Sequence, residues 1–187
     1  WNDPAYTDPM TGLRNSRFLI ERLEEEINRT WRHNLPISCV VMDFVEDEQQ
    51  SNAKNRNNEG SEKEYDLESE LFLMQVALAL RNNSRSSDLL ARYDSAKFAI
   101  LLPNYELNNV CGYVKKLSRE IETALYREFS PLNIFSKFGI VTGKGRSITS
   151  SEEFLGMAMR NLLRAMALPG VIAVGRDLNA DLDLVID

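Results

Sequence analysis

The sequence has little of the residues that mark cross-linked, metal-stapled or hydrolytic proteins. Only 2 of its 187 residues are cysteine, and Cys39 and Cys111 lie far apart without a CxxC pair. They indicate buried thiols in a reducing compartment, and they exclude a disulfide framework or a zinc site of the usual spacing. His33 is the only histidine, so neither a catalytic triad nor a histidine-rich metal site is supported.

Long apolar runs and an excess of basic residues are absent too. No run approaches the roughly 18 residues of a membrane span, and no signal-peptide pattern opens the chain. The formal charge is −6, from 22 basic and 28 acidic residues, which disfavours a general nucleic-acid-binding surface. Because the chain starts at Trp1, we expect a piece of a longer multidomain protein, cytoplasmic in this part and without membrane contact.

The spacing of the apolar residues predicts alternating helices and strands. Hydrophobic residues make up 43% of the sequence, enough to bury a core. The predicted order is a helix over 15–33, a strand over 37–44, a helix over 66–82 that is apolar on more than one side, a hairpin of strands 89–93 and 98–102, a helix over 107–125, a strand over 134–142, a helix over 154–166 and a strand over 171–174. This order predicts a mixed α/β (α+β) sheet covered by helices.

We expect one domain over residues 1–187, with two segments outside its core. Residues 46–64 form a predicted polar loop insertion, because the stretch from Glu46 to Glu70 holds nine acidic and three basic residues and few apolar ones. The length of this loop also admits a partner-binding role. Residues 176–187 are predicted to be a C-terminal tail.

Three stretches resemble, in the same order, the motifs of one family. Residues 8–15 (DPMTGLRN) resemble the DPLTGLxN motif of GGDEF domains, the diguanylate cyclase family, and residues 40–44 (VVMDF) resemble its strand ending in a metal-binding aspartate. Residues 85–103 are similar to its RxxDxxxRYGGDEFxxLLP block, but the signature reads DSAKF. The chain is therefore identified as a degenerate member of that family. The resemblance implies a ferredoxin-like, nucleotidyl-cyclase-type fold with a central mixed sheet of about five strands flanked by helices.

The resemblance also implies that an active member joins two GTP molecules with the help of divalent metal held by carboxylates, as phosphoryl transfer requires. It assigns Asp43 to the first metal ligand, but the second carboxylate position is Ala96 and the next acidic position is Lys97. A methyl group cannot coordinate Mg²⁺, which needs hard oxygen ligands. Lys97 has two interpretations: a surface residue of the hairpin, or a partner of Asp43 that takes the metal's place.

Other positions that the resemblance assigns to the substrate are altered as well. Asp94 and Ser95 replace two glycines, and the phosphate-binding lysine and arginine fall on Ala167 and Val171. Glu70 stands at the position of a guanine-binding aspartate and is a possible guanine contact. We therefore expect no catalytic residues and no required cofactor. Mg²⁺ is not expected, and the retained aspartate of the first strand would be its ligand if it bound.

A ligand-binding motif survives at Arg85 and Asp88, where the resemblance implies the inhibitory site for cyclic di-GMP. A guanidinium can bind a phosphate or the guanine O6/N7 edge, and a carboxylate can accept from guanine N1 and N2. The resemblance implies a second cation, for which Arg81, Lys116 and Arg119 are candidates. The alternative is a local Arg–Asp pair that pins the loop before the strand, worth about 0–1 kcal/mol if exposed.

Two functions are consistent with these residues. The first is a catalytically inactive signalling domain that binds cyclic di-GMP and acts as a receptor or regulator. The second is a protein-interaction domain that binds no nucleotide and regulates an active cyclase, a phosphodiesterase or an upstream sensor domain, also as a homo- or heterodimer with GGDEF or EAL proteins. Non-productive GTP binding through Asp43 and Glu70 is a third. No nucleic-acid partner is expected.

Overall fold

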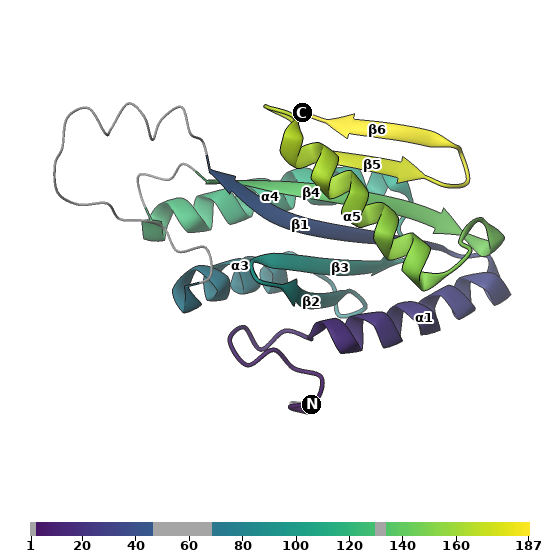
Figure 1. The fold of residues 1–187 in the computed structure, drawn as a ribbon, viewed down its shortest axis with the longest axis horizontal. Helices are drawn as coiled ribbons and strands as arrows, with labels where there is room; N and C mark the ends of the chain where they lie inside the picture. The colour runs from purple at the N-terminus through teal and green to yellow at the C-terminus, as the bar shows by residue number, and fades with distance from the viewer. Residues whose placement is uncertain (1–2, 47–68, 130–133) are drawn as a thin grey trace, which may run out of the picture.

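A computed structural model of the chain describes residues 3–46, 69–129 and 134–187. Its elements follow the predicted order (Figure 1): α1 (Ser16–His33), β1 (Pro36–Glu46), α3 (Glu70–Asn82), β2 (Leu89–Asp94), β3 (Lys97–Pro103), α4 (Leu107–Phe129), β4 (Ile134–Lys144), the short 3-10 helix η1 (Gly145–Ser147), α5 (Ser151–Ala167), β5 (Ala173–Asp177) and β6 (Leu182–Ile186). The expected loop insertion lies outside the described residues except for Glu46, which ends β1. Among the described residues, no helix is long and apolar enough to cross a membrane.

Short polar side chains fix where the helices begin. Asn15, Ser69 and Ser150 precede α1, α3 and α5, and each accepts a backbone N–H three residues further on. Such caps satisfy donors that the first helical turn leaves without a partner. At the other end of α1, Asn34 adopts a left-handed backbone with φ 52°, which ends the helix and turns the chain into β1.

The six strands form one mixed sheet in the order β2-β3-β1-β4-β5-β6. β1 lies in the middle and pairs antiparallel with both β3 and β4, whereas β4 and β5 are parallel. Helices cover both faces: α5 crosses the face turned to the viewer in Figure 1, and α3 and α4 pack on the other. The mixed, helix-flanked α/β fold is therefore confirmed.

The sheet has one strand more than expected, because residues 176–187 are not a tail. Residues 182–186 pair antiparallel with β5 as strand β6. The chain reverses where Asp177 Oδ1 accepts the backbone N–H groups of Asn179 and Ala180, a turn that aspartate favours. Ile186 then joins the core. This strand has only five residues, and most of them are exposed although four of the five are apolar.

β1 is buried on both faces, and its alternate residues enter two different core clusters. Val40 and Met42 pack with α3 and α4, whereas Cys39 and Val41 pack with α1 and α5. Burial on both faces explains why the strand reads as one continuous apolar run. Asp43 follows Val41 by two residues and therefore lies on the face of the sheet that α1 and α5 cover.

Both cysteines are free thiols. Cys39 is fully buried in β1, and Cys111 is half-buried in α4. Burial raises the pKa of the Cys39 thiol to about 12, so this thiol stays protonated and unreactive at neutral pH.

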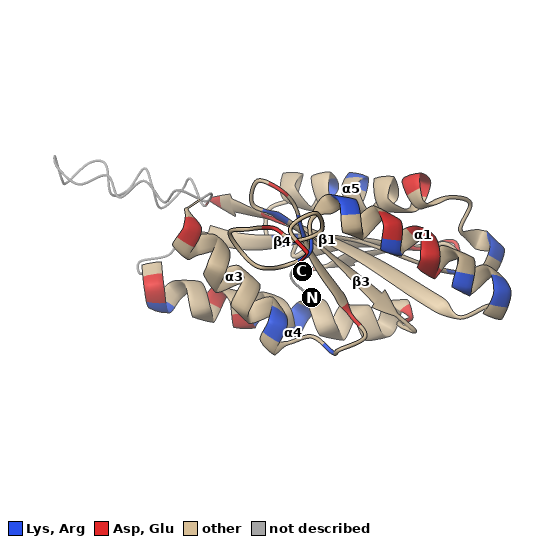
Figure 2. Cartoon of the chain, turned by 90° about the horizontal axis from the view of Figure 1, so that it is seen from below, with Lys and Arg blue, Asp and Glu red and all other residues tan. Residues whose placement is uncertain are grey.

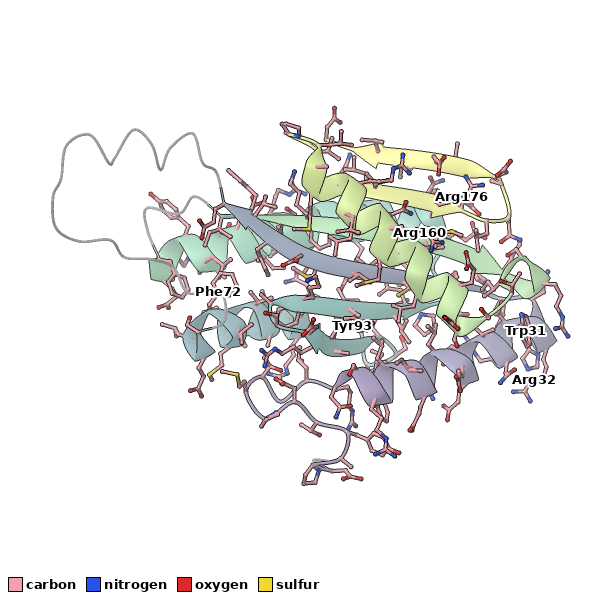
Figure 3. All side chains as sticks on the ribbon, viewed as in Figure 1. Trp31, Arg32, Phe72, Tyr93, Arg160 and Arg176 are labelled. Carbon is pink, nitrogen blue, oxygen red and sulfur yellow. The ribbon has the colours of Figure 1, made fainter. Side chains whose placement is uncertain are left out.

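α3 is less buried than its sequence predicts. Phe72 (labelled in Figure 3) and Val76 lie on its buried side, but Leu71, Met74 and Leu78 are about half exposed, at 50%, 49% and 50%. Their spacing places all three on one side of the helix. The helix packs on its neighbours only with the opposite side. Figure 2 shows charged residues spread along α1, whereas the middle of α3 has none. We call Leu71, Met74 and Leu78 the α3 stripe.

α5 lies directly on β4 because β4 has no side chain at Gly139. A Cβ atom there would lie 2.1 Å from the Ala158 carbonyl oxygen and 2.2 Å from the Leu162 nitrogen. The contact is held in addition by Asn161, whose buried Nδ2 donates to the Ile140 carbonyl oxygen at 2.9 Å. The position of α5 over the sheet therefore depends on this glycine.

Gly139→Ala is expected to lower the free energy of unfolding by about 3 kcal/mol or more, because the methyl group would meet helix backbone that cannot move aside. Urea denaturation followed by circular dichroism measures the change. Gly112→Ala in α4 is the control, since a Cβ there meets nothing within 4 Å and helix propensity predicts a gain of up to about 1 kcal/mol. Unchanged stability of Gly139→Ala would contradict the close packing.

Candidate functional site

Asp43 lies near the end of β1 between two lysines of the neighbouring strands. The strand register pairs it with Lys137 of β4, and Lys97 of β3 lies on its other side. Lys97 Nζ is 3.5 Å from Asp43 Oδ2, and Asp43 Oδ1 accepts the backbone N–H of the next residue at 2.8 Å. Of the two interpretations of Lys97, this geometry supports the ion pair with Asp43.

A divalent metal does not fit this set of side chains. Ala96, next to Lys97, is 5% exposed and offers only a methyl group. The Lys97 ammonium occupies the approach to Asp43, and two unit charges 4 Å apart repel by roughly 4 kcal/mol at an effective dielectric near 20. Across the described residues, no three His, Cys, Asp or Glu side chains come together as a possible metal site.

The turn of the β2–β3 hairpin contains a residue with positive φ at one of the two positions where the resemblance expects glycine. Ser95 adopts φ 47°, a left-handed conformation that glycine favours. Arg92 holds this turn, since its Nε donates to the Ser95 carbonyl oxygen at 2.7 Å and its Nη1 to Asp8 Oδ1 at 3.1 Å. Two of the three motifs found in the sequence are thus joined in space, which leaves the frame of the site intact around altered side chains.

Lys137 is a buried lysine that the sequence analysis missed. Its residue is 6% exposed, and its Nζ donates to the Leu168 carbonyl oxygen at 3.1 Å and to that of Val171. Both carbonyls follow the end of α5, close to Ala167, where the resemblance expects phosphate-binding side chains. The sequence signal that could have indicated a buried lysine is its position within the apolar strand predicted over 134–142. Burial lowers the pKa of Lys137.

Glu70, the possible guanine contact, is the first residue of α3 and is exposed. A carboxylate in the first turn complements the positive end of the helix dipole. The structure therefore gives this side chain a favourable place on the helix, and its contact with guanine stays a prediction.

Arg85 and Asp88 lie in the loop between α3 and β2. Asp88 Oδ2 accepts the Arg85 backbone N–H at 2.8 Å, and Asp88 Oδ1 accepts from Arg85 Nη2 at 3.3 Å. Arg85 Nη2 also donates to the Pro103 carbonyl oxygen at 3.2 Å. The Asp88 side chain is 0% exposed, whereas that of Arg85 is 51% exposed. These contacts pin the loop and leave half of the Arg85 side chain in solvent; ligand binding here stays a prediction.

Two tyrosines behind Arg85 were also missed. Arg85 Cζ lies 4.2 Å from the centroid of the Tyr105 ring, and Tyr105 meets Tyr113 edge to face with centroids 6.0 Å apart. The Tyr113 hydroxyl and Ser84 Oγ are hydrogen-bonded at 2.9 Å, and burial raises the pKa of Tyr113. No local sequence signal connects these rings to Arg85, because the contact is made by a loop, a strand end and α4.

The three candidates for a second cation differ in their surroundings. Arg81 Nη2 donates to the Thr11 carbonyl oxygen at 2.7 Å and so ties α3 to the N-terminal motif. Lys116 and Arg119 are exposed on α4. Lys116 lies three residues after Tyr113 and thus on the same face of the helix as that tyrosine.

The mixed sheet, the hairpin beside the end of its central strand and the three joined motifs define a domain of the nucleotidyl-cyclase class. The family described as diguanylate cyclase, GGDEF domain, matches residues 66–167. Diguanylate cyclase DgcP from Pseudomonas aeruginosa is 30% identical over 162 residues, which are 86% of this chain. The chain therefore belongs to the GGDEF family. It spans 22% of the length of DgcP.

Solved structures show the same fold. The coiled coil and GGDEF domain of DgcB from Caulobacter crescentus, in complex with c-di-GMP, aligns with a TM-score of 0.70 at 18% identity, over 88% of this chain and 82% of that one. Diguanylate cyclase SiaD from Pseudomonas aeruginosa, in complex with its activator SiaC, aligns with a TM-score of 0.65 at 23% identity, over 87% of this chain and 58% of that one.

The burial of Lys137 predicts a pH dependence of stability. Its pKa in the folded state is lower than the ordinary value of 10.5, so between these two values the unfolded state binds more protons and the free energy of unfolding rises with pH. Below the lowered pKa both states are protonated and this dependence vanishes. Urea denaturation at several alkaline pH values, compared between wild type and Lys137→Met, isolates the effect. Equal slopes in the two proteins would contradict it.

Proposed function

We propose that this chain is a catalytically inactive GGDEF domain that binds cyclic di-GMP through Arg85 and acts as a receptor or regulator in signalling. The observation that supports the loss of catalysis is the ion pair between Lys97 and Asp43, whose Nζ and Oδ2 atoms are 3.5 Å apart. The proposed binding is supported by the half-exposed side chain of Arg85, in a motif typical of that ligand. Activity and partners of the longer protein are part of this proposal.

The loss of catalysis rests on charge at the end of β1. Phosphoryl transfer needs cations that bridge phosphates and are held by carboxylates. Here the ammonium of Lys97 already neutralises Asp43, and the neighbouring position is the methyl group of Ala96. The Nζ of Lys137 is occupied as well, because it donates to the Leu168 and Val171 carbonyl oxygens beyond α5. Among the residues that the structure describes, no group of three or more His, Cys, Asp or Glu side chains could hold a metal.

The binding of cyclic di-GMP rests on Arg85. Its side chain is exposed enough to meet a ligand and is held in one orientation by Asp88, Pro103 and Tyr105. A pre-organised guanidinium loses little freedom when it binds phosphate or a purine. The DgcB structure in complex with c-di-GMP is compatible with such a ligand on this fold.

A second candidate is a protein-interaction domain that binds no nucleotide. The observation that favours it is the α3 stripe of Leu71, Met74 and Leu78, half exposed without charged neighbours along the middle of the helix. Exposed apolar patches of this kind mark protein contacts. SiaD in complex with its activator SiaC is a precedent for protein partners on this fold, and here an active cyclase, a phosphodiesterase or an upstream sensor domain would be the partner.

The metal site is testable by restoring it. Wild type is expected to show no Asp43-dependent binding of Mn²⁺, because Lys97 holds that carboxylate. The double variant Ala96→Glu/Lys97→Glu is expected to bind Mn²⁺ at least about tenfold more tightly, a gain of about 1.4 kcal/mol, since a carboxylate then replaces the Lys97 ammonium beside Asp43. Calorimetric titration measures both, and adding Asp43→Asn to the double variant should remove the gain.

Two results would contradict the proposed loss of catalysis. One is Mn²⁺ binding by the wild type that Asp43→Asn abolishes. The other is formation of cyclic di-GMP from GTP and Mg²⁺ by the purified wild-type chain.

Cyclic di-GMP is expected to bind the wild type with a micromolar dissociation constant and Arg85→Ala at least about tenfold more weakly, because the variant lacks the guanidinium. Calorimetry measures both. Arg146→Ala is the matched control, since Arg146 makes a similar contact with the ring of Trp31 (labelled in Figure 3), with Cζ 4.5 Å from the centroid. If the folded wild type gives no heat of binding, the interaction domain is the better description.

A further inference from the structure

We propose that β6 is an edge at which an extended segment of a partner protein, with alternating basic and apolar residues, adds to the sheet as a further strand. This interaction is separate from the proposed ligand of Arg85. It follows from the open hydrogen-bonding edge of β6, from the apolar side chains exposed on this strand, and from the excess of acidic residues around it.

The two edges of the sheet differ in how they are covered. The outer edge of β2 is occupied by Arg14, whose backbone N–H donates to the Leu90 carbonyl oxygen at 3.1 Å and whose carbonyl oxygen accepts the Arg92 N–H at 2.9 Å. β6 forms the opposite edge, and in the described part of the chain no strand lies beyond it (Figure 1). An uncovered edge presents N–H and C=O groups that can pair with another chain.

The outward hydrogen-bonding groups of β6 belong to Asp183 and Val185. The Ile186 carbonyl oxygen accepts the Ile172 N–H at 2.7 Å, so the backbone groups of Ile186 point toward the β5 side. In an antiparallel pair, successive residues turn their N–H and C=O groups alternately toward the neighbouring strand and away from it. Asp183 and Val185 therefore turn two donors and two acceptors away from β5, where an added strand would bind them.

The two faces of β6 offer different side chains to such a strand. Leu182, Leu184 and Ile186 lie on one face, on which Ile186 is buried in the core and Leu182 is 50% exposed. Asp183 lies on the other face with Val185, which is also 50% exposed. Directly opposed residues of paired strands have Cβ atoms roughly 5 Å apart, so an added strand would cover the exposed apolar side chains.

Charge determines which strand fits this edge. Residues 176–187 include one basic and four acidic residues, a net charge of −3. Arg176 is ion-paired with Asp181 and Asp183, but the side chains of these aspartates are still 86% and 54% exposed. Since opposite charges on opposed residues stabilise a strand pair, lysine or arginine on the face that meets Asp183 favours binding. Together with the apolar face, this predicts alternating basic and apolar residues in the partner.

A second copy of β6 is a poor partner for the same reason. Outward groups of two antiparallel β6 strands meet with full overlap in three registers, centred on Asp183, Leu184 or Val185. The first places Asp183 opposite itself. The second places Asp181 opposite Asp187, and the third places Asp183 opposite Asp187. Like charges directly opposite destabilise a strand pair, so the aspartates protect the edge from self-association and leave it open to a basic strand.

The probe is a short synthetic peptide of alternating lysine and valine, blocked at both ends. We expect it to bind the wild-type chain in calorimetric titration, and to shift the amide signals of Asp183 and Val185 in NMR spectra. Val185→Pro should weaken binding at least about tenfold, because it removes an outward N–H at a place where an edge strand tolerates proline. Val185→Thr keeps this N–H and should bind within about threefold of wild type. Circular dichroism verifies that both variants are folded.

A second peptide separates strand pairing from attraction by charge alone. It has the same charge, but proline replaces its central valine, and we expect no binding to the wild type. Equal affinity of the two peptides, or equal affinity of wild type and Val185→Pro for the first, would overturn the proposal. Amide shifts confined to β2 or to the α3 stripe, or no binding of the first peptide, would overturn it as well. A wild-type dimer paired through β6 would overturn the choice of partner.

Discussion

The central position of β1, hydrogen-bonded on both sides by antiparallel neighbours, is the constraint on which the candidate site depends. A strand in this position has no freedom to slide, because a shift by one residue would turn its buried side chains from one core cluster to the other. It therefore holds Asp43 on the face shared with α1 and α5, between Lys97 and Lys137. A change of charge at any of these three positions therefore changes the electrostatic energy of the charged side chains on the adjacent strands.

The two lysines balance different negative groups. Lys97 is paired with a carboxylate whose side chain is 14% exposed, and an aspartate so buried would be costly without a partner. Lys137 binds carbonyl oxygens just beyond α5, at the negative end of the helix dipole. Both lysines thus bind acceptors of the protein itself.

The order of the helices and strands could be predicted from the sequence, because strong apolar periodicity is a local signal. The family could be predicted as well, because the motifs at residues 8–15 and 85–103 are also local. The sequence left Lys97 with two interpretations, since the ion pair is set by the register of β1 against β3. Lys137 and Tyr105 were missed because their partners lie in other elements. The α3 stripe was misjudged for a related reason: composition indicates how apolar a helix is, but not how many of its sides find a neighbour.

The two parts of the chain that resemble ligand sites differ in how their charged side chains are bound. At the end of β1 the charged side chains bind one another or backbone carbonyls, so an incoming nucleotide would have to displace an ion pair. In the loop before β2 the internal contacts of Arg85 use only Nη2 and one face of the guanidinium. Asp88 accepts from the Arg85 backbone N–H and from Arg85 Nη2, and this contact fixes the guanidinium in place. Pre-organisation of Arg85 is thus a consequence of one buried carboxylate.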